Sequence, residues 1–84
     1  MKHLATPRFW RCFGTLPDSV QELARKNLDL LKIDERHPSL HFKKIGKFYS
    51  IRIGLPYRAL GVKTPEGVAW FWIGNHADYD KLIG

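Results

Sequence analysis

Four residues in the second half of the chain could act together on a phosphodiester: Arg52, Arg58, His76 and Tyr79. An arginine guanidinium stays charged and can form two parallel hydrogen bonds to a phosphate. A histidine gives or takes a proton near neutral pH. A tyrosine offers a ring face for a nucleobase and a hydroxyl group. These residue types are the parts that RNA cleavage without a metal ion needs.

In that reaction, a base takes the proton of a ribose 2′-hydroxyl, and the oxygen attacks the adjacent phosphorus. Arginines stabilise the charge that develops on the phosphate oxygens, and an acid protonates the departing 5′-oxygen. The alternative interpretation is structural, with Arg52 as a surface charge, His76 as the neighbour of a helix cap and Tyr79 as a packing residue. Residue types alone leave both interpretations open.

The surrounding charge favours an anionic partner. The stretch 36–65 holds no acidic residue and half of the chain's 14 Lys and Arg, and the whole chain carries a net charge of +6. Its polar and apolar residues alternate as in strands, so the charge is expected on a rigid sheet, and nucleic acid is the leading candidate. A basic face that only keeps the protein in solution is the alternative. The residues expected to contact RNA are Lys43, Lys44, Lys47, Arg52 and Lys63.

Two helices are predicted before the basic stretch, after a segment 1–5 that is either an edge strand or a frayed end. Thr6-Pro7 is typical of a helix start, and Gly14 ends this short helix after about Phe13. Apolar spacings of three and four predict an amphipathic helix over about 20–33. Asp18 or Ser19 is expected to cap this helix, with Glu22 completing a capping box. Its expected apolar positions are Val20, Leu23, Ala24, Leu28, Leu30, Leu31 and Ile33.

The stretch 41–75 reads as sheet, with strands near 49–53, 57–63 and 68–74, and Asn75 is the expected cap of a helical tail over 76–84. The fold class is therefore α+β: two N-terminal helices packed on a three- to four-stranded antiparallel sheet, with a short C-terminal helix. Residues 1–84 are expected to form a single domain.

Several kinds of site are not expected. The single Cys12 excludes an internal disulfide and a multi-cysteine zinc site, and we expect its thiol to be buried and inert. His37 and His41 have the spacing of a helical metal pair, but Pro38 breaks any helix between them. We expect no metal and no cofactor. Without a membrane-spanning run or a signal-peptide pattern, a cytoplasmic protein with no membrane partner is expected.

The chain resembles the RelE/ParE superfamily, the small toxins of type II toxin–antitoxin systems. The resemblance covers nearly the whole chain: Leu16-Pro17 leading into the long helix, "HPSLHFKKI" (37–45), "FYSIRIGLPYRALGV" (48–62) and "VAWFWIGNHADYDKLI" (68–83). It implies a microbial-RNase-like fold with helices on one face of a twisted sheet. It also implies a cognate antitoxin and a metal-free, ribosome-dependent endoribonuclease that cuts mRNA in the ribosomal A site and so inhibits translation.

Carried over by position, Arg58 of "YR" matches the phosphate-binding arginine of the family, and Arg52 a basic strand position on the same surface. His76 matches a histidine that transfers protons in some branches, while the match of Tyr79 is looser. The lysines fit contacts to the backbone of mRNA or rRNA. Some members carry a general-base carboxylate near the entrance to the sheet; this chain has none there, although His41 could substitute.

Two other function classes stay open. ParE-like members inhibit DNA gyrase by binding and cleave no RNA, and the fold alone does not separate them from nucleases. A non-toxic protein of the same fold, acting with its partner in a repressor complex, is the third possibility.

Overall fold

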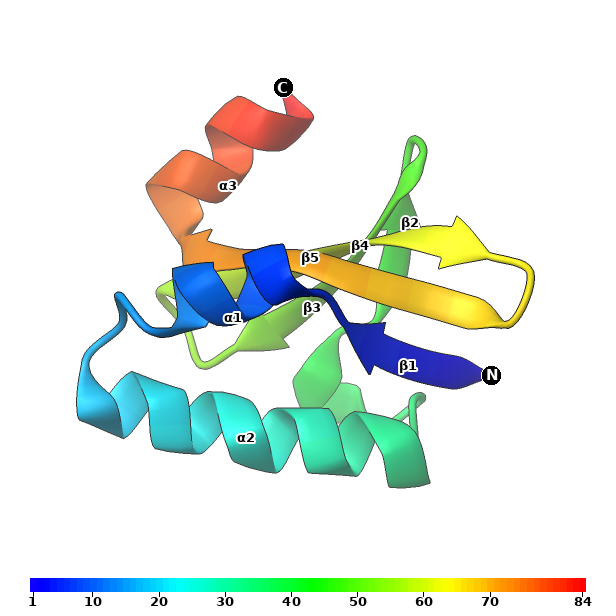
Figure 1. The fold of residues 1–84 in the computed structure, drawn as a ribbon, viewed down its shortest axis with the longest axis horizontal. Coiled ribbons are helices and arrows are strands. Elements are labelled where there is room, and N and C mark those ends of the chain that lie inside the picture. The colour runs from blue at the N-terminus through cyan, green and yellow to red at the C-terminus, as the bar shows by residue number, and fades with distance from the viewer.

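Two consecutive helices precede a run of four strands, the order expected for an α+β fold, and the computed structural model describes all of residues 1–84 (Figure 1). The elements are β1 (Lys2–Ala5), α1 (Pro7–Phe13), α2 (Asp18–Ile33), the 3₁₀ turn η1 (Pro38–Leu40), β2 (Lys43–Ile45), β3 (Phe48–Ile53), β4 (Tyr57–Thr64), β5 (Gly67–Asn75) and α3 (His76–Ile83). None of the helices has the length and apolar content that a membrane crossing requires.

The sheet has five strands in the order β1-β5-β4-β3-β2. Strands β2 to β5 form the predicted antiparallel meander. The prediction of three to four strands fell short because β1 pairs in parallel with β5, with His3 opposite Val68. The buried His3 secures this edge strand, since its Nδ1 accepts a hydrogen bond from Trp70 Nε1 at 3.1 Å and its Nε2 lies 3.3 Å from Glu35 Oε1.

The predicted helix caps are confirmed at two of three helices. The Thr6 hydroxyl accepts a hydrogen bond from the Phe9 amide, and the Asn75 side chain accepts one from the Asp78 amide. The capping box at α2 is wrong. Asp18 and Ser19 lie inside the helix, which follows Pro17 without any side-chain cap. Asp18 still suits the first turn, because its negative charge interacts favourably with the positive N-terminal end of the helix dipole.

Helices cover both faces of the sheet. Ala59 belongs to the main core with α1 and α2, whereas the next residue, Leu60, packs with Trp72 and Tyr79 of α3. Because neighbouring residues of a strand point to opposite faces, α3 lies across the sheet from α2, as Figure 1 shows. The resemblance had implied helices on one face only.

A β-bulge gives β5 its two buried faces. The pairing shifts between Leu60 and Gly61, so that Trp72 pairs with Leu60 and Trp70 with Gly61. Trp70 therefore faces α2 and Trp72 faces α3, which confirms the doubly covered strand predicted from the sequence.

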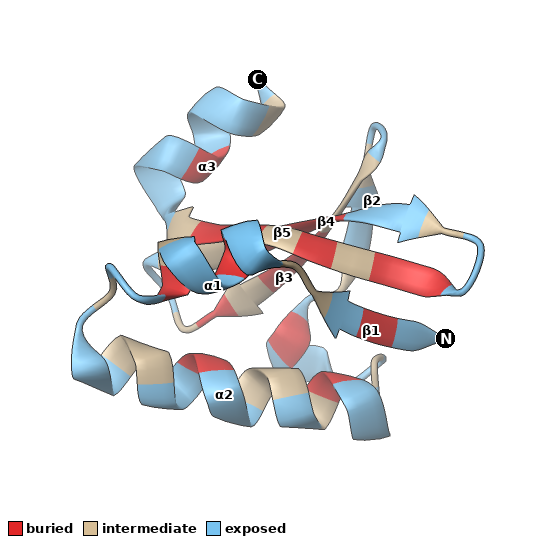
Figure 2. Ribbon diagram, in the orientation of Figure 1, coloured by how far each residue is buried: buried red, intermediate tan, exposed pale blue.

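Burial follows the predicted pattern over most of α2, with corrections at Leu23 and Ile33, which are exposed, and at Cys12 of α1. Figure 2 shows the buried and half-buried positions of α2 turned toward the sheet and the exposed ones turned away, with Ala24 and Leu31 in the core. Ile33, expected on the apolar face, is 83% exposed, because the helix ends there and the core does not reach its last turn. Cys12, expected to be buried, is half-buried.

Candidate active site

Arg52 and Arg58 face each other across two antiparallel strands. They are direct partners in the register of β3 and β4. Arg58 lies two residues before Leu60, so both arginines are on the α3 face of the sheet and not on the α2 face. Two like charges held side by side in a sheet are unfavourable unless an anion lies between them or near them.

The guanidinium of Arg58 is fixed by the turn that joins β3 to β4. Its Nη1 donates to the carbonyl oxygens of Tyr57 at 2.8 Å and Leu55 at 3.0 Å, with a longer contact of 3.4 Å to Gly54. Gly54, in the same turn, has a φ of 65°, in the left-handed region that favours glycine. One nitrogen orients the group, and the remaining donors are free for a ligand.

Burial is the main cause that lowers the pKa of Arg58, and the positive charge of Arg52 lowers it further. Tyr79 and Asp80 act on the same pKa in the opposite direction. Arginine stays protonated despite such a shift. The lowered pKa means that keeping the Arg58 guanidinium charged costs free energy in this site, and a bound phosphate would reduce that cost.

Arg52 is half-buried and carries unused hydrogen-bonding capacity. Its backbone carbonyl accepts a hydrogen bond from Asn27 Nδ2 of α2 at 3.0 Å, which fixes the strand at this point. Its side-chain Nε is buried without a hydrogen-bond partner. A buried N–H left unpaired is uncommon in proteins and makes this position of the arginine energetically unfavourable.

The end of β5 brings His76 to the same turn. Gly74 pairs with Arg58 across β4 and β5, and the His76 amide donates to the carbonyl of Pro56 at 2.8 Å. His76 is the first residue of α3 and lies two residues after Gly74, the partner of Arg58. Its half-exposed ring has Nδ1 3.0 Å from Asp80 Oδ2 and its centroid 5.9 Å from that of Tyr79. Arg52, Arg58, His76, Tyr79 and Asp80 are called the arginine site below.

Tyr79 joins this site in a different way from that expected. The residue is only 4% exposed and packs with Leu60 and Trp72, so its ring is not a stacking surface for a base. The structural interpretation of Tyr79 is confirmed for its ring, and a role of its hydroxyl group in proton transfer stays a prediction.

The predicted basic face is divided between the two sides of the sheet. Lys43 pairs with Ser50, two residues before Arg52, so it shares the face of the arginines. Lys44 pairs with Tyr49, and Lys63 with Val68, both of which contribute to the α2 side. Lys47 lies in the β2–β3 turn, with its Nζ 5.5 Å from the centroid of the Phe48 ring.

The two histidines before β2 lie in the η1 turn. His41 was expected in a strand, but it closes η1 in the left-handed conformation with a φ of 47°, two residues before β2 begins. His37 caps the same turn, and its Nδ1 accepts a hydrogen bond from the Ser39 amide. No group of three or more His, Cys, Asp and Glu side chains is placed to hold a metal ion.

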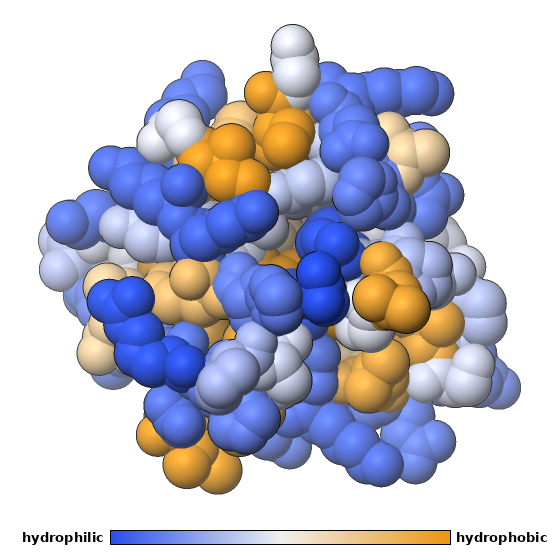
Figure 3. All heavy atoms as spheres, turned by 180° about the vertical axis from the view of Figure 1, so that it is seen from behind, coloured by the Kyte–Doolittle hydropathy of each residue, from blue (hydrophilic) through white to orange (hydrophobic).

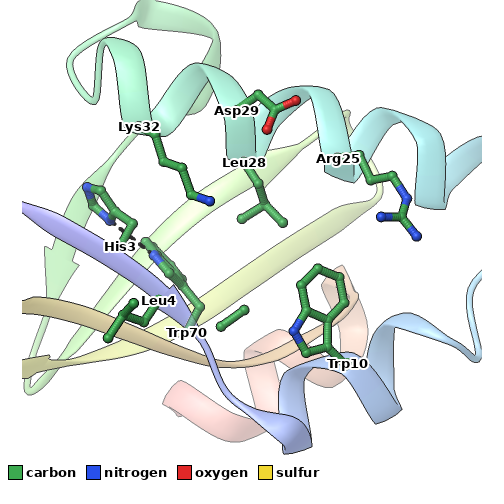
Figure 4. A pocket seen from close by; sticks show the side chains of 9 residues that line it. His3, Leu4, Trp10, Arg25, Leu28, Asp29, Lys32 and Trp70 are labelled. Carbon is green, nitrogen blue, oxygen red and sulfur yellow. Dashed lines mark hydrogen bonds between the residues drawn. The ribbon is translucent and has the colours of Figure 1, made fainter.

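Two cavities lie outside the arginine site. One of about 180 Å³ lies between β1, α1 and α2, where Leu28 and Lys32 reach from α2 toward Trp70 and Trp10 stands on α1 (Figure 4). It belongs to the α2 side of the sheet. A second, more open one of about 440 Å³ lies where α1 ends and α3 begins, and includes Arg11, Gly74 and Asp78. Seen from behind, the surface is mostly hydrophilic, with separate small apolar patches (Figure 3).

Asp80 and the carbonyls around Arg58 were missed from the sequence. Asp80 follows His76 by four residues in a predicted helix, a spacing that puts both side chains on one face, so the contact was open to prediction. The carbonyl oxygens of Leu55 and Tyr57 carry no such signal, because any residue type provides a carbonyl.

The comparisons with known proteins agree with this architecture. The family described as "ParE-like toxin domain" matches residues 18–81, so the chain belongs to the ParE-like toxin domain family. Among solved structures, a chain of the RelB-RelE antitoxin-toxin complex from Methanococcus jannaschii is similar with a TM-score of 0.73 at 14% identity, covering 96% of this chain and 99% of that one. No curated protein sequence matches the chain. The resemblance to the RelE/ParE superfamily of type II toxins is confirmed.

Proposed function

We propose that the protein is a toxin that cleaves mRNA on the ribosome by attack of a ribose 2′-hydroxyl on the adjacent phosphorus. The observation that carries the proposal is the pair Arg52 and Arg58 on adjacent strands. Both are positively charged, one has a buried N–H without an acceptor, and the other is oriented by backbone carbonyls. A phosphate supplies the charge and the acceptors that this pair lacks.

His76 and Tyr79 supply the proton transfers in this proposal. The His76 imidazole takes the proton of the 2′-hydroxyl as its oxygen forms a bond to phosphorus. Arg58 and Arg52 stabilise the charge on the non-bridging oxygens, and the bond from phosphorus to the 5′-oxygen breaks. The Tyr79 hydroxyl protonates the departing 5′-oxygen, which leaves a 2′,3′-cyclic phosphate on one fragment and a 5′-hydroxyl on the other.

The test uses purified protein and ribosomes programmed with an end-labelled mRNA. We expect cleavage whose upstream fragment ends in a 2′,3′-cyclic phosphate, and no cleavage when the nucleotide before the cut carries a 2′-deoxyribose. His76→Ala and Arg58→Ala should each lower the rate by about 10²-fold or more. Lys26→Ala, at an exposed position of α2, is the control for loss of a positive charge. A wild-type protein that is folded and leaves the mRNA intact would overturn the proposal.

Inhibition of DNA gyrase is the second candidate, because the matching family is named for ParE. A gyrase inhibitor works by binding and has no use for a histidine poised to transfer a proton. A supercoiling assay with purified gyrase separates the two candidates. Inhibition at micromolar protein that survives in His76→Ala would favour gyrase, whereas unaffected supercoiling together with mRNA cleavage would favour the nuclease.

We also propose that a cognate antitoxin with an acidic segment binds the protein over the stretch from Lys43 to Lys63. The support is charge complementarity, together with the similar fold of the RelB-RelE complex. Reversing the charge at Lys43 and Lys44 should weaken binding and reduce its dependence on salt. Binding that responds neither to salt nor to these substitutions would contradict this interface.

A further inference from the structure

We propose that Asp80 is a positioning residue for His76, which it holds in the tautomer that leaves Nε2 free to accept a proton. This inference rests on the proposed nuclease function and adds a residue to it. His76 and Asp80 are one helical turn apart on α3, and Nδ1 of the histidine lies 3.0 Å from Oδ2 of the aspartate. The Asn75 cap fixes the start of this helix and thereby the position of both residues.

The contact selects one of the two neutral forms of the imidazole. An ionised carboxylate only accepts hydrogen bonds, so the hydrogen of the neutral ring must be on Nδ1. The lone pair is then on Nε2. A histidine in water favours the opposite tautomer, with the hydrogen on Nε2, so the carboxylate reverses the ordinary preference.

The same pair assists the step that forms the imidazolium. Once Nε2 has taken the proton of the 2′-hydroxyl, the ring is a cation and the adjacent carboxylate stabilises it. Carboxylate–histidine pairs in hydrolases orient and stabilise the ring in this manner, without the carboxylate itself becoming protonated. The negative charge of Asp80 also raises the pKa of Arg58, so the same carboxylate acts on the proton-transfer group and on the phosphate-binding group.

A purely structural role explains the position of Asp80 less well. The two side chains are 51% and 57% exposed, and an ion pair so close to water adds little to stability. A carboxylate next to the arginines also opposes the binding of RNA by simple repulsion. Removing it should therefore tighten RNA binding while it slows cleavage, a combination that loss of fold or loss of general charge would not produce.

The first test measures the tautomer directly and needs no activity. Ring nitrogen chemical shifts of His76 are recorded by NMR in the wild type and in Asp80→Ala, at a pH where the ring is neutral. We expect the hydrogen mainly on Nδ1 in the wild type and mainly on Nε2 in the variant. Asp78→Ala removes a carboxylate from the same helix without a contact to His76 and should keep the wild-type tautomer. The same tautomer in Asp80→Ala as in the wild type would overturn the inference.

The second test measures cleavage on programmed ribosomes under single-turnover conditions. Asp80→Ala should lower the rate at saturating protein by at least about 10-fold. Asp80→Glu should restore most of this loss, because its carboxylate can reach the same ring from the same helical face. Equal rates for Asp80→Ala and Asp78→Ala would refute the positioning role. If the wild type cleaves nothing, the proposed function fails, while the tautomer measurement still decides whether Asp80 orients His76.

Discussion

Replacement of Arg52 by methionine should stabilise the protein. The substitution keeps an unbranched apolar stem of similar length and removes two unfavourable features. One is the buried Nε without a hydrogen-bond partner, and the other is the positive charge opposite Arg58 in the register of β3 and β4. A residue retained despite such costs indicates selection for binding a ligand and not for stability.

The magnitude follows from these two features. An unpaired buried donor costs about 1–3 kcal/mol, and like charges directly opposite in a sheet cost about 0.2–1 kcal/mol. Because the residue as a whole is half-buried, a small movement of the side chain can bring Nε to water, and we expect a net gain near the lower end, about 1–2 kcal/mol. For a domain of this size, each kcal/mol corresponds to roughly 4–8 °C in Tm.

The assay is thermal and urea unfolding of the wild type, Arg52→Met and Lys44→Met. Lys44 is an exposed strand position on the other face, so its variant controls for the loss of one positive charge. Inorganic phosphate should stabilise the wild type and have less effect on Arg52→Met, because binding to the folded state raises stability by mass action. If Arg52→Met is less stable than the wild type, the idea that this arginine is held for a ligand is refuted.

Three further changes test the packing that supports the site. Gly74→Ala should destabilise the protein by about 1–3 kcal/mol in urea unfolding, because the added methyl would collide with the Trp72 ring; unchanged stability would contradict this packing. Thr6→Ala should cost about 1 kcal/mol through the lost helix cap, with Thr6→Ser close to the wild type; equal losses in both would argue against the cap. His3→Ala should cost about 1–3 kcal/mol or more, because it leaves the Trp70 indole N–H buried without its acceptor; a wild-type Tm would exclude that role.

Local signals in the sequence predicted the parts of the fold that depend on a few neighbouring residues. Thr6 and Asn75 cap their helices as expected, since an N-cap is decided by one side chain and an amide three residues later. The cap of α2 was predicted from the same kind of signal and was wrong. Pro17 holds the preceding backbone in place, and the helix begins one residue before the expected box.

Features that depend on distant pairing were not open to prediction in this way. The parallel partner of β1 is β5, more than sixty residues later, and no local pattern in residues 1–5 names it. The bulge between Leu60 and Gly61 sends Trp72 to the α3 side, where it buries Tyr79. The prediction of Tyr79 as a stacking residue was wrong because it did not include this one-residue shift in register.

The arginine site illustrates both situations. The sequence predicted Arg52 and Arg58 on adjacent strands, and the register makes them direct neighbours. Alternation along the strands, applied with that register, separates Lys44 and Lys63 from them. The unpaired Nε of Arg52 and the carbonyls that hold Arg58 are consequences of three-dimensional packing, which residue types do not encode.

The central claim is that the arginine site cuts mRNA on the ribosome. The measurement that tests it most directly is primer extension on an mRNA from an in vitro translation reaction, with wild-type protein, His76→Ala and free RNA run side by side. We expect cuts at A-site positions with the wild type, no cuts with His76→Ala and no cuts in free RNA. Intact mRNA with folded wild-type protein, or equal cutting by His76→Ala, would contradict it.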